Sequence, residues 1–90
     1  MIREPYYSPD VELILNGLEK GSDTRLLNAV CDAIDLICDH GDSAKARAEM
    51  LITKAGTHIW KTPVRDRRFD WCVLWEPQDG LAVIYFIGEL

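Results

Sequence analysis

Residues 59–90, IWKTPVRDRRFDWCVLWEPQDGLAVIYFIGEL, decide the fold of this 90-residue chain. Trp60–Val64 is typical of a strand, and Phe69–Trp75 predicts a second one because apolar and polar side chains alternate along it. Arg65–Arg68 is the expected turn between them, and Pro77–Gly80 is an expected hairpin turn. The nearly all-apolar stretch Leu81–Ile87 suits the interior of a sheet. We therefore predict three consecutive strands here.

Two helices are predicted upstream of these strands. Ser8-Pro9-Asp10 provides a capping hydroxyl, a proline at the first helical position and a carboxylate at the positive end of the helix dipole. This helix should end at Gly21. The second helix should begin after Ser22 and Asp23 and continue, with apolar residues at helical spacing, to His40-Gly41. Because only two or three residues join them, the helices should form an antiparallel hairpin.

The remaining segments complete an α+β fold. Ile2–Tyr7 predicts a short first strand, which Pro5 confines to an edge. Residues 43–54 have good helix propensity, so we expect a short third helix that Gly56 ends. The predicted order is strand, helix, helix, short helix and three strands. This order favours a single domain, residues 1–90, with a twisted, mainly antiparallel sheet and the helical hairpin on one face.

Composition points to an ordinary globular protein, with 48% hydrophobic and 28% charged residues. Met1-Ile2 is followed at once by Arg3-Glu4-Pro5, which does not resemble a secretory leader. The longest apolar run, Leu81–Ile87, is far shorter than the roughly 20 residues that span a bilayer. We therefore expect a soluble, cytoplasmic protein that does not bind membranes.

The three cysteines are interpreted as small hydrophobic side chains in a reducing compartment, and they are Cys31, Cys38 and Cys72. Cys38, His40 and His58 lack any recognised ligand spacing, so no metal site and no cofactor is predicted. His40 is expected to close the second helix, where a positive charge suits the carbonyl end.

Charge is distributed unevenly along the chain. The formal net charge is −5, yet residues 44–68 hold seven basic and two acidic residues, a balance of +5 that leaves −10 for the rest. A pI of about 4.8 argues against general affinity for nucleic acid. A local basic groove could still bind one RNA or an acidic peptide; alternatively, the arginines meet solvent or pair with Asp66 and Asp70. The candidate target-binding residues are Lys45, Arg47, Lys54, His58, Arg65, Arg67 and Arg68.

A second candidate surface is acidic. Asn28, Asp32, Asp35 and Asp39 recur at helical spacing opposite the apolar face of the second helix. They are either a solvated face or a surface for a basic partner. The tryptophans leave two similar alternatives, since they could stack on bases or belong to the core. Alternation along the strands favours core or half-buried positions for Trp60, Trp71 and Trp75.

Several segments together resemble the RelE/ParE toxin superfamily of bacterial type II toxin-antitoxin systems. They are Tyr7-Ser8-Pro9-Asp10-Val11 at the start of the first helix, the helical hairpin, Trp60-Lys61-Thr62-Pro63-Val64-Arg65, Phe69, and Phe86-Ile87-Gly88. The resemblance implies a toxin neutralised by a cognate antitoxin protein. RelE-like members cut mRNA in the ribosomal A site with lysine and arginine side chains, which here implies Lys61 and Arg65, whereas ParE-like members act on DNA gyrase. A homodimer is an open alternative.

The chain departs from the RelE pattern at three places. Lys61 matches the first of the family's two strand lysines, but Pro63 occupies the position of the second. Asp70 follows Phe69 where the family has arginine, and only Glu89 and Leu90 follow Gly88, where the family continues with catalytic groups. Arg65, Arg67, Arg68 and His58 are the side chains available as substitutes. The prediction is therefore a toxin that binds a ribosome/mRNA or gyrase target, with weak or absent endoribonuclease activity. The alternative is a non-toxic protein-interaction module of the same fold.

Overall fold

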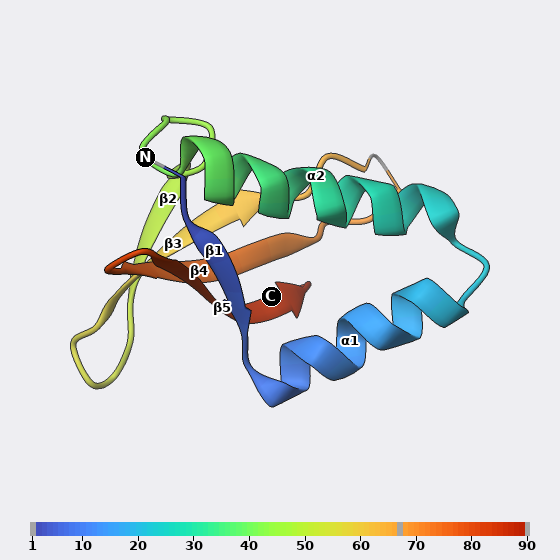
Figure 1. Ribbon diagram of the computed structural model, residues 1–90, viewed down its shortest axis with the longest axis horizontal. Helices are drawn as coiled ribbons and strands as arrows, with labels where there is room; N and C mark the ends of the chain where they lie inside the picture. The colour runs from blue at the N-terminus through green and yellow to red at the C-terminus, as the bar shows by residue number, and fades with distance from the viewer. Residues whose placement is uncertain (1, 67, 90) are drawn as a thin grey trace.

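The computed structural model describes residues 2–66 and 68–89, which form two helices and a five-stranded sheet (Figure 1). The chain runs β1 (Glu4–Tyr7), α1 (Pro9–Lys20), α2 (Thr24–His40), β2 (Glu49–Ile52), β3 (His58–Pro63), β4 (Cys72–Gln78) and β5 (Leu81–Gly88). The strand order across the sheet is β1-β5-β4-β3-β2. β1 pairs with β5 in parallel, and the other three pairings are antiparallel. The predicted α+β class and mainly antiparallel sheet are confirmed.

Both helices begin where their capping residues predict. The Ser8 hydroxyl accepts a hydrogen bond from the Val11 N–H at 3.3 Å, and Pro9 is the first residue of α1. An Asp23 carboxylate oxygen accepts from the Leu26 N–H at 3.0 Å at the start of α2. Gly21 follows the last residue of α1, and His40 closes α2, as expected. Neither helix in the described part of the chain is long and apolar enough to cross a membrane.

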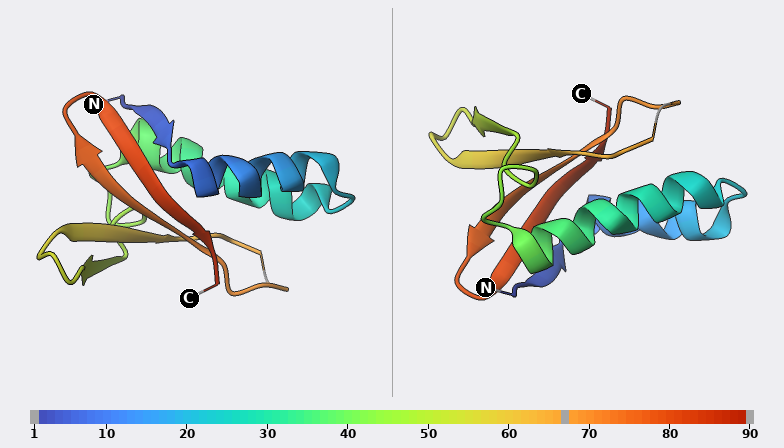
Figure 2. Two further views of the ribbon diagram at one scale, coloured as in Figure 1. Left: turned by 90° about the horizontal axis from the view of Figure 1, so that it is seen from below. Right: turned by 90° about the horizontal axis from the view of Figure 1, so that it is seen from above.

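The two helices lie on the same face of the sheet and enclose the core with it (Figure 2). Trp75 of β4 is fully buried, and its indole N–H donates to the Thr62 hydroxyl at 2.9 Å. Thr62, also fully buried, donates in turn to the carbonyl of Ala46. This chain of bonds satisfies two polar side chains that would otherwise be costly to bury. The largest fully buried side chains besides Trp75 are Ile37, Ile84, Ile87, Val11, Val30 and Val73.

The predicted third helix over residues 43–54 is wrong. Ser43 caps only a single turn, with its hydroxyl accepting from the Ala46 N–H at 3.2 Å. The chain then enters β2, which pairs with β3 so that Glu49 lies opposite Lys61 and Ile52 opposite His58. The adjacent apolar residues 50–52 suit a strand better than a helix stripe, because three consecutive residues cannot share one helix face. Pairing with β3 outweighs the helix propensity of the preceding residues.

Two boundaries in the C-terminal part also differ from the prediction. β4 begins at Cys72 instead of Phe69. The loop between β3 and β4 is described at residues 64–66 and 68–71, and Phe69 and Trp71 still pack against the core. At the other end, β4 continues through Pro77 to Gln78, so the hairpin turn is the two residues Asp79-Gly80. Asp79 has a φ of +52°, a conformation that Asp tolerates in tight turns.

Candidate binding groove beside helix α2

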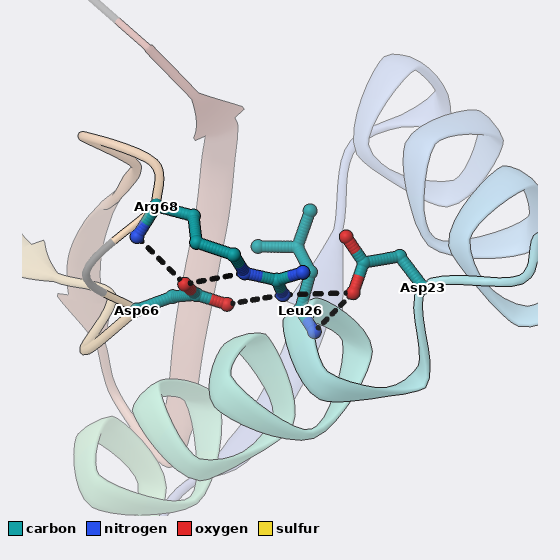
Figure 3. Close-up of polar contacts among 4 residues, drawn as sticks. All are labelled: Asp23, Leu26, Asp66 and Arg68. Carbon is teal, nitrogen blue, oxygen red and sulfur yellow. Dashed lines mark hydrogen bonds and ion pairs between the residues drawn. The ribbon is translucent and has the colours of Figure 1, made fainter.

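The loop of residues 64–71 is attached to the start of α2 by Arg68 (Figure 3). The Arg68 guanidinium donates to both oxygens of Asp66, from Nε at 3.2 Å and from Nη2 at 2.9 Å, and Nη2 also reaches Asp23 Oδ1 at 2.9 Å. The Arg68 backbone N–H adds a bond to Asp66 at 3.0 Å. Asp23 is the cap of α2, so one arginine joins the loop to the first turn of that helix.

Electrostatics hold this cluster in its charged form. The side chain of Asp66 has no exposed surface, and the hydrogen bonds from Arg68 lower its pKa to about 2. The pKa of Asp23 is lowered by the backbone bond from Leu26 and then by Arg68. Both carboxylates raise the pKa of Arg68. One cation therefore lies between two carboxylates. Because both carboxylates offset its charge, Arg68 serves to hold the loop and not to attract a target.

Two more of the predicted basic residues are also paired. Arg47 donates from Nε to the Gly41 carbonyl and from Nη2 to Asp42, both at 2.8 Å, and its guanidinium lies 4.9 Å from the centre of the Trp60 ring. Lys61 lies 3.5 Å from the Glu49 carboxylate, in the register set by β2 and β3. The charges of Arg47 and Lys61 are therefore partly neutralised by the carboxylates of Asp42 and Glu49.

The exposed cations do not gather in one place. Lys45 precedes β2, Lys54 lies in the β2–β3 turn and His58 begins β3, whereas Arg65 follows the far end of that strand. Each of these four side chains is exposed, and none forms an ion pair within residues 2–66 and 68–89. Arg67, the remaining residue of the predicted cluster, lies outside the described residues. Lys54 and His58 thus lie at the start of β3, whereas Arg65 follows its end, and Lys45 precedes Ala46, whose carbonyl is bonded to Thr62 near that end.

Arg65 instead lines a groove between α2 and the end of β3. The groove has a volume of about 530 Å³, and its lining residues are Arg25, Asn28, Ala29, Asp32, Ala33, Leu36, Pro63 and Arg65. Two residues of the predicted acidic face, Asn28 and Asp32, therefore share a site with the predicted basic turn. Asp35 does not line this groove and borders a separate hollow beside α1, and Asp39 is exposed nearer the end of α2.

The chemistry of the groove suits binding. Alanine, leucine and proline side chains supply apolar surface, while two guanidinium groups, one amide and one carboxylate supply polar anchors. Arg25 was not predicted as a site residue. The signal is present in the sequence, because Arg25, Asn28, Asp32 and Leu36 are spaced by three or four residues and so form one stripe of the helix.

Aromatic and thiol side chains belong mainly to the structure. Trp75 is buried, while Trp60 and Trp71 are half-buried against the core, so the prediction for the tryptophans is confirmed. Cys38 and Cys72 are buried, and burial raises the pKa of both thiols. Cys31 is exposed, contrary to the expectation of a buried thiol, because it lies at the edge of the apolar stripe of α2. Within the described residues, no three His, Cys, Asp or Glu side chains gather as metal ligands.

Comparisons with protein-family models, with curated proteins and with solved structures found no match to this chain. The groove therefore has to be interpreted from its own residues, as a mixed polar and apolar binding site on an α+β domain.

Proposed function

We propose that this protein is toxin-like, of the RelE/ParE kind, and acts by binding a ribosome/mRNA or gyrase target instead of cutting RNA. The observation that carries the proposal is the groove in which Arg65 and Arg25 flank apolar residues of α2. A site with two cations beside apolar surface can hold a macromolecular partner, and it needs no nucleophile or general base for that purpose.

The arrangement of the elements supports the RelE/ParE part of the proposal. A strand precedes a helical hairpin, consecutive antiparallel strands follow it, and the hairpin covers one face of the sheet. Ser8-Pro9 starts α1, and Phe86-Ile87-Gly88 ends β5, at the places where the resemblance expects them.

The ion pairs support binding over catalysis. Lys61, the one lysine that matches the RelE pattern, has its charge offset by Glu49, and Arg68 is held by two carboxylates. Removing one well-placed electrostatic group can cost about 3 to 4 kcal/mol of transition-state stabilisation. Because Pro63, Asp70 and the short segment after Gly88 stand where RelE members have catalytic groups, target binding is the better-supported source of any toxicity.

The second candidate function is a non-toxic interaction module. It is favoured by the mixed charge of the groove, where Asp32 lies among the same lining residues as the two arginines. A carboxylate opposes phosphate binding, whereas a protein segment carrying both signs of charge can satisfy every polar group there.

Induced expression in a bacterial host separates these functions. We expect the wild-type chain and Lys61→Met to arrest growth, and Arg25→Ala with Arg65→Ala to relieve the arrest. Lys20→Ala, at the exposed end of α1, is the matched control and should behave as wild type. Protein and DNA synthesis followed separately would distinguish a ribosomal from a gyrase target. Unimpaired growth at high wild-type expression would overturn the toxin proposal, and loss of toxicity in Lys61→Met alone would restore a catalytic mechanism.

A further inference from the structure

The two edges of the sheet are protected to very different degrees. β1 contains Pro5, which has no N–H to offer, and both helices contact this strand. The Arg3 N–H, just before it, donates to the Cys38 carbonyl at the end of α2 at 2.8 Å. β2 has the sequence Glu49-Met50-Leu51-Ile52, with no proline, and β3 is the only element in the described structure that it contacts (Figure 2). An edge of this kind is a template for another strand.

The hydrogen-bond pattern shows which backbone groups of β2 are free. The Thr53 N–H donates to the Thr57 carbonyl at 2.9 Å, which places Thr53 among the residues whose backbone faces β3. Backbone direction alternates along an antiparallel strand, so Leu51 also faces β3. The N–H and C=O groups of Met50 and Ile52 then point outward from the sheet. Two residues, with four backbone groups, are available to an added strand.

The side chains of the same two residues add an apolar contact. Met50 is 44% exposed and Ile52 63% exposed, and residues two apart lie on one face of the sheet. Met50 lies opposite Trp60, which packs against the core, so this pair is on the helix side of the sheet. An incoming strand with apolar side chains at alternate positions would cover both.

The charges beside β2 distinguish between two strands that could pair with it, the β2 of a second copy and an acidic segment of another protein. Exposed lysines stand before and after β2, at Lys45 and Lys54, while the charge of Lys61 is offset by Glu49. In a symmetric pairing of two copies centred on Leu51, Lys54 of one copy would approach the segment containing Lys45 of the other. Like charges would then meet at both ends, although the chain as a whole carries −5. A strand with acidic ends is the better match.

We propose that β2 binds, by strand addition, an extended segment of another protein that has alternating apolar residues between acidic ends. The segment would become the sixth strand of the sheet, hydrogen-bonded to Met50 and Ile52, with its carboxylates beside Lys45 and Lys54. No residue of this site lines the α2 groove, so the proposal does not depend on the function proposed for that groove.

Fluorescently labelled nonapeptides provide the test. Fluorescence anisotropy would compare Asp-Asp-Val-Thr-Ile-Thr-Val-Asp-Asp with the same peptide bearing lysine in place of each aspartate. We expect the acidic peptide to bind and the basic one to bind at least about tenfold more weakly, since two ion pairs are exchanged for repulsions. Hydrogen exchange should show new protection of the Met50 and Ile52 amides in the complex.

Two variants check the position of the bound strand. Ile52→Pro removes an outward N–H without removing a bond to β3, and it should abolish binding of the acidic peptide. Lys45→Glu with Lys54→Glu keeps the backbone intact and should reverse the preference toward the basic peptide. Circular dichroism would establish that both variants remain folded. If Ile52→Pro perturbs the fold, the charge-reversed variant decides by itself.

Three results would overturn the proposal. One is the absence of acidic-peptide binding at millimolar concentration, and another is binding that survives both variants. The third is a concentration-dependent dimer, seen by light scattering, that Ile52→Pro abolishes, because a second copy would then occupy the edge.

Discussion

The two ends of β3 carry similar side chains but differ in how they are held. After the strand, the loop of residues 64–71 is joined to α2 by Arg68, which bridges Asp66 and Asp23. Before the strand, β2 contacts no element of the described structure other than β3, and Lys54 and His58 are exposed. A basic side chain of this protein is therefore available to a partner only where no carboxylate lies beside it.

Arg65 and Arg68 show the same contrast within one loop. Arg65 lines the groove and forms no ion pair in the part of the chain that the structure describes, whereas Arg68 is part of the scaffold that positions the loop. Replacing both arginines at once would therefore confuse a loss of binding with a loss of structure, and the two must be tested separately.

The largest effect is expected at Thr62, the residue of β3 that ties the hairpin end to the core. Thr62→Val keeps the shape but removes the acceptor for the Trp75 indole N–H and the donor to the Ala46 carbonyl. Since each of the two orphaned buried groups costs roughly 1 to 3 kcal/mol, we expect a loss of about 2 to 6 kcal/mol in the free energy of unfolding. Urea denaturation would measure it. Thr62→Ser, which retains the hydroxyl, should lose much less. A loss for Thr62→Val no larger than that for Thr62→Ser would show that the two hydrogen bonds contribute no more to stability than the buried methyl group.

A smaller effect on stability is expected from removing the Arg68 bridge between the loop and α2. Arg68→Ala leaves the buried Asp66 carboxylate without its main partner, so the melting temperature should fall and amide exchange in residues 64–71 should accelerate. Arg65→Ala, the matched control three residues away, should change neither quantity. Equal melting temperatures for the two variants would show that the Arg68 bridge contributes nothing to stability.

The pH dependence of stability should give the smallest signal. The folded-state pKa of Asp66, about 2, lies below its ordinary value of 3.8, so the unfolded chain binds more protons at this group. Its contribution is present above about pH 4 and is lost as the pH falls toward 2; Asp23, whose pKa is also lowered, acts in the same direction. Urea midpoints between pH 2 and 7 should fall less steeply on acidification for Asp66→Asn than for wild type. Parallel curves would contradict the assignment.

The features predicted correctly are those that depend on near neighbours. The Ser8 and Asp23 caps, and the strand pattern around Val73 and Trp75, are local, so the sequence alone indicates two helices and the last three strands. β2 could not be found in the same way, because its geometry depends on pairing with β3. Local propensity there favoured a helix instead.

The ion pairs of the basic residues could not be predicted from the sequence for a similar reason. Arg65 is exposed, as expected for a turn residue, but Asp23, a carboxylate that offsets the charge of Arg68, is 45 residues away in the chain. The approach of α2 to the end of β3, which creates the groove, is equally long-range. A sequence shows which side chains carry charge, and the tertiary fold decides which of those charges are already matched.

The parallel pairing of β1 with β5 has a consequence for biosynthesis. Glu4–Tyr7 is made first, yet its partners, Leu81–Ile84, are translated more than 70 residues later. During elongation β1 has no paired strand, and the helical hairpin can form before β3, β4 and β5, which also pack against it, have been translated. Since such distant pairings are slow to form, we expect the sheet to close only after translation of β5, with the nascent hairpin exposed to chaperones until then.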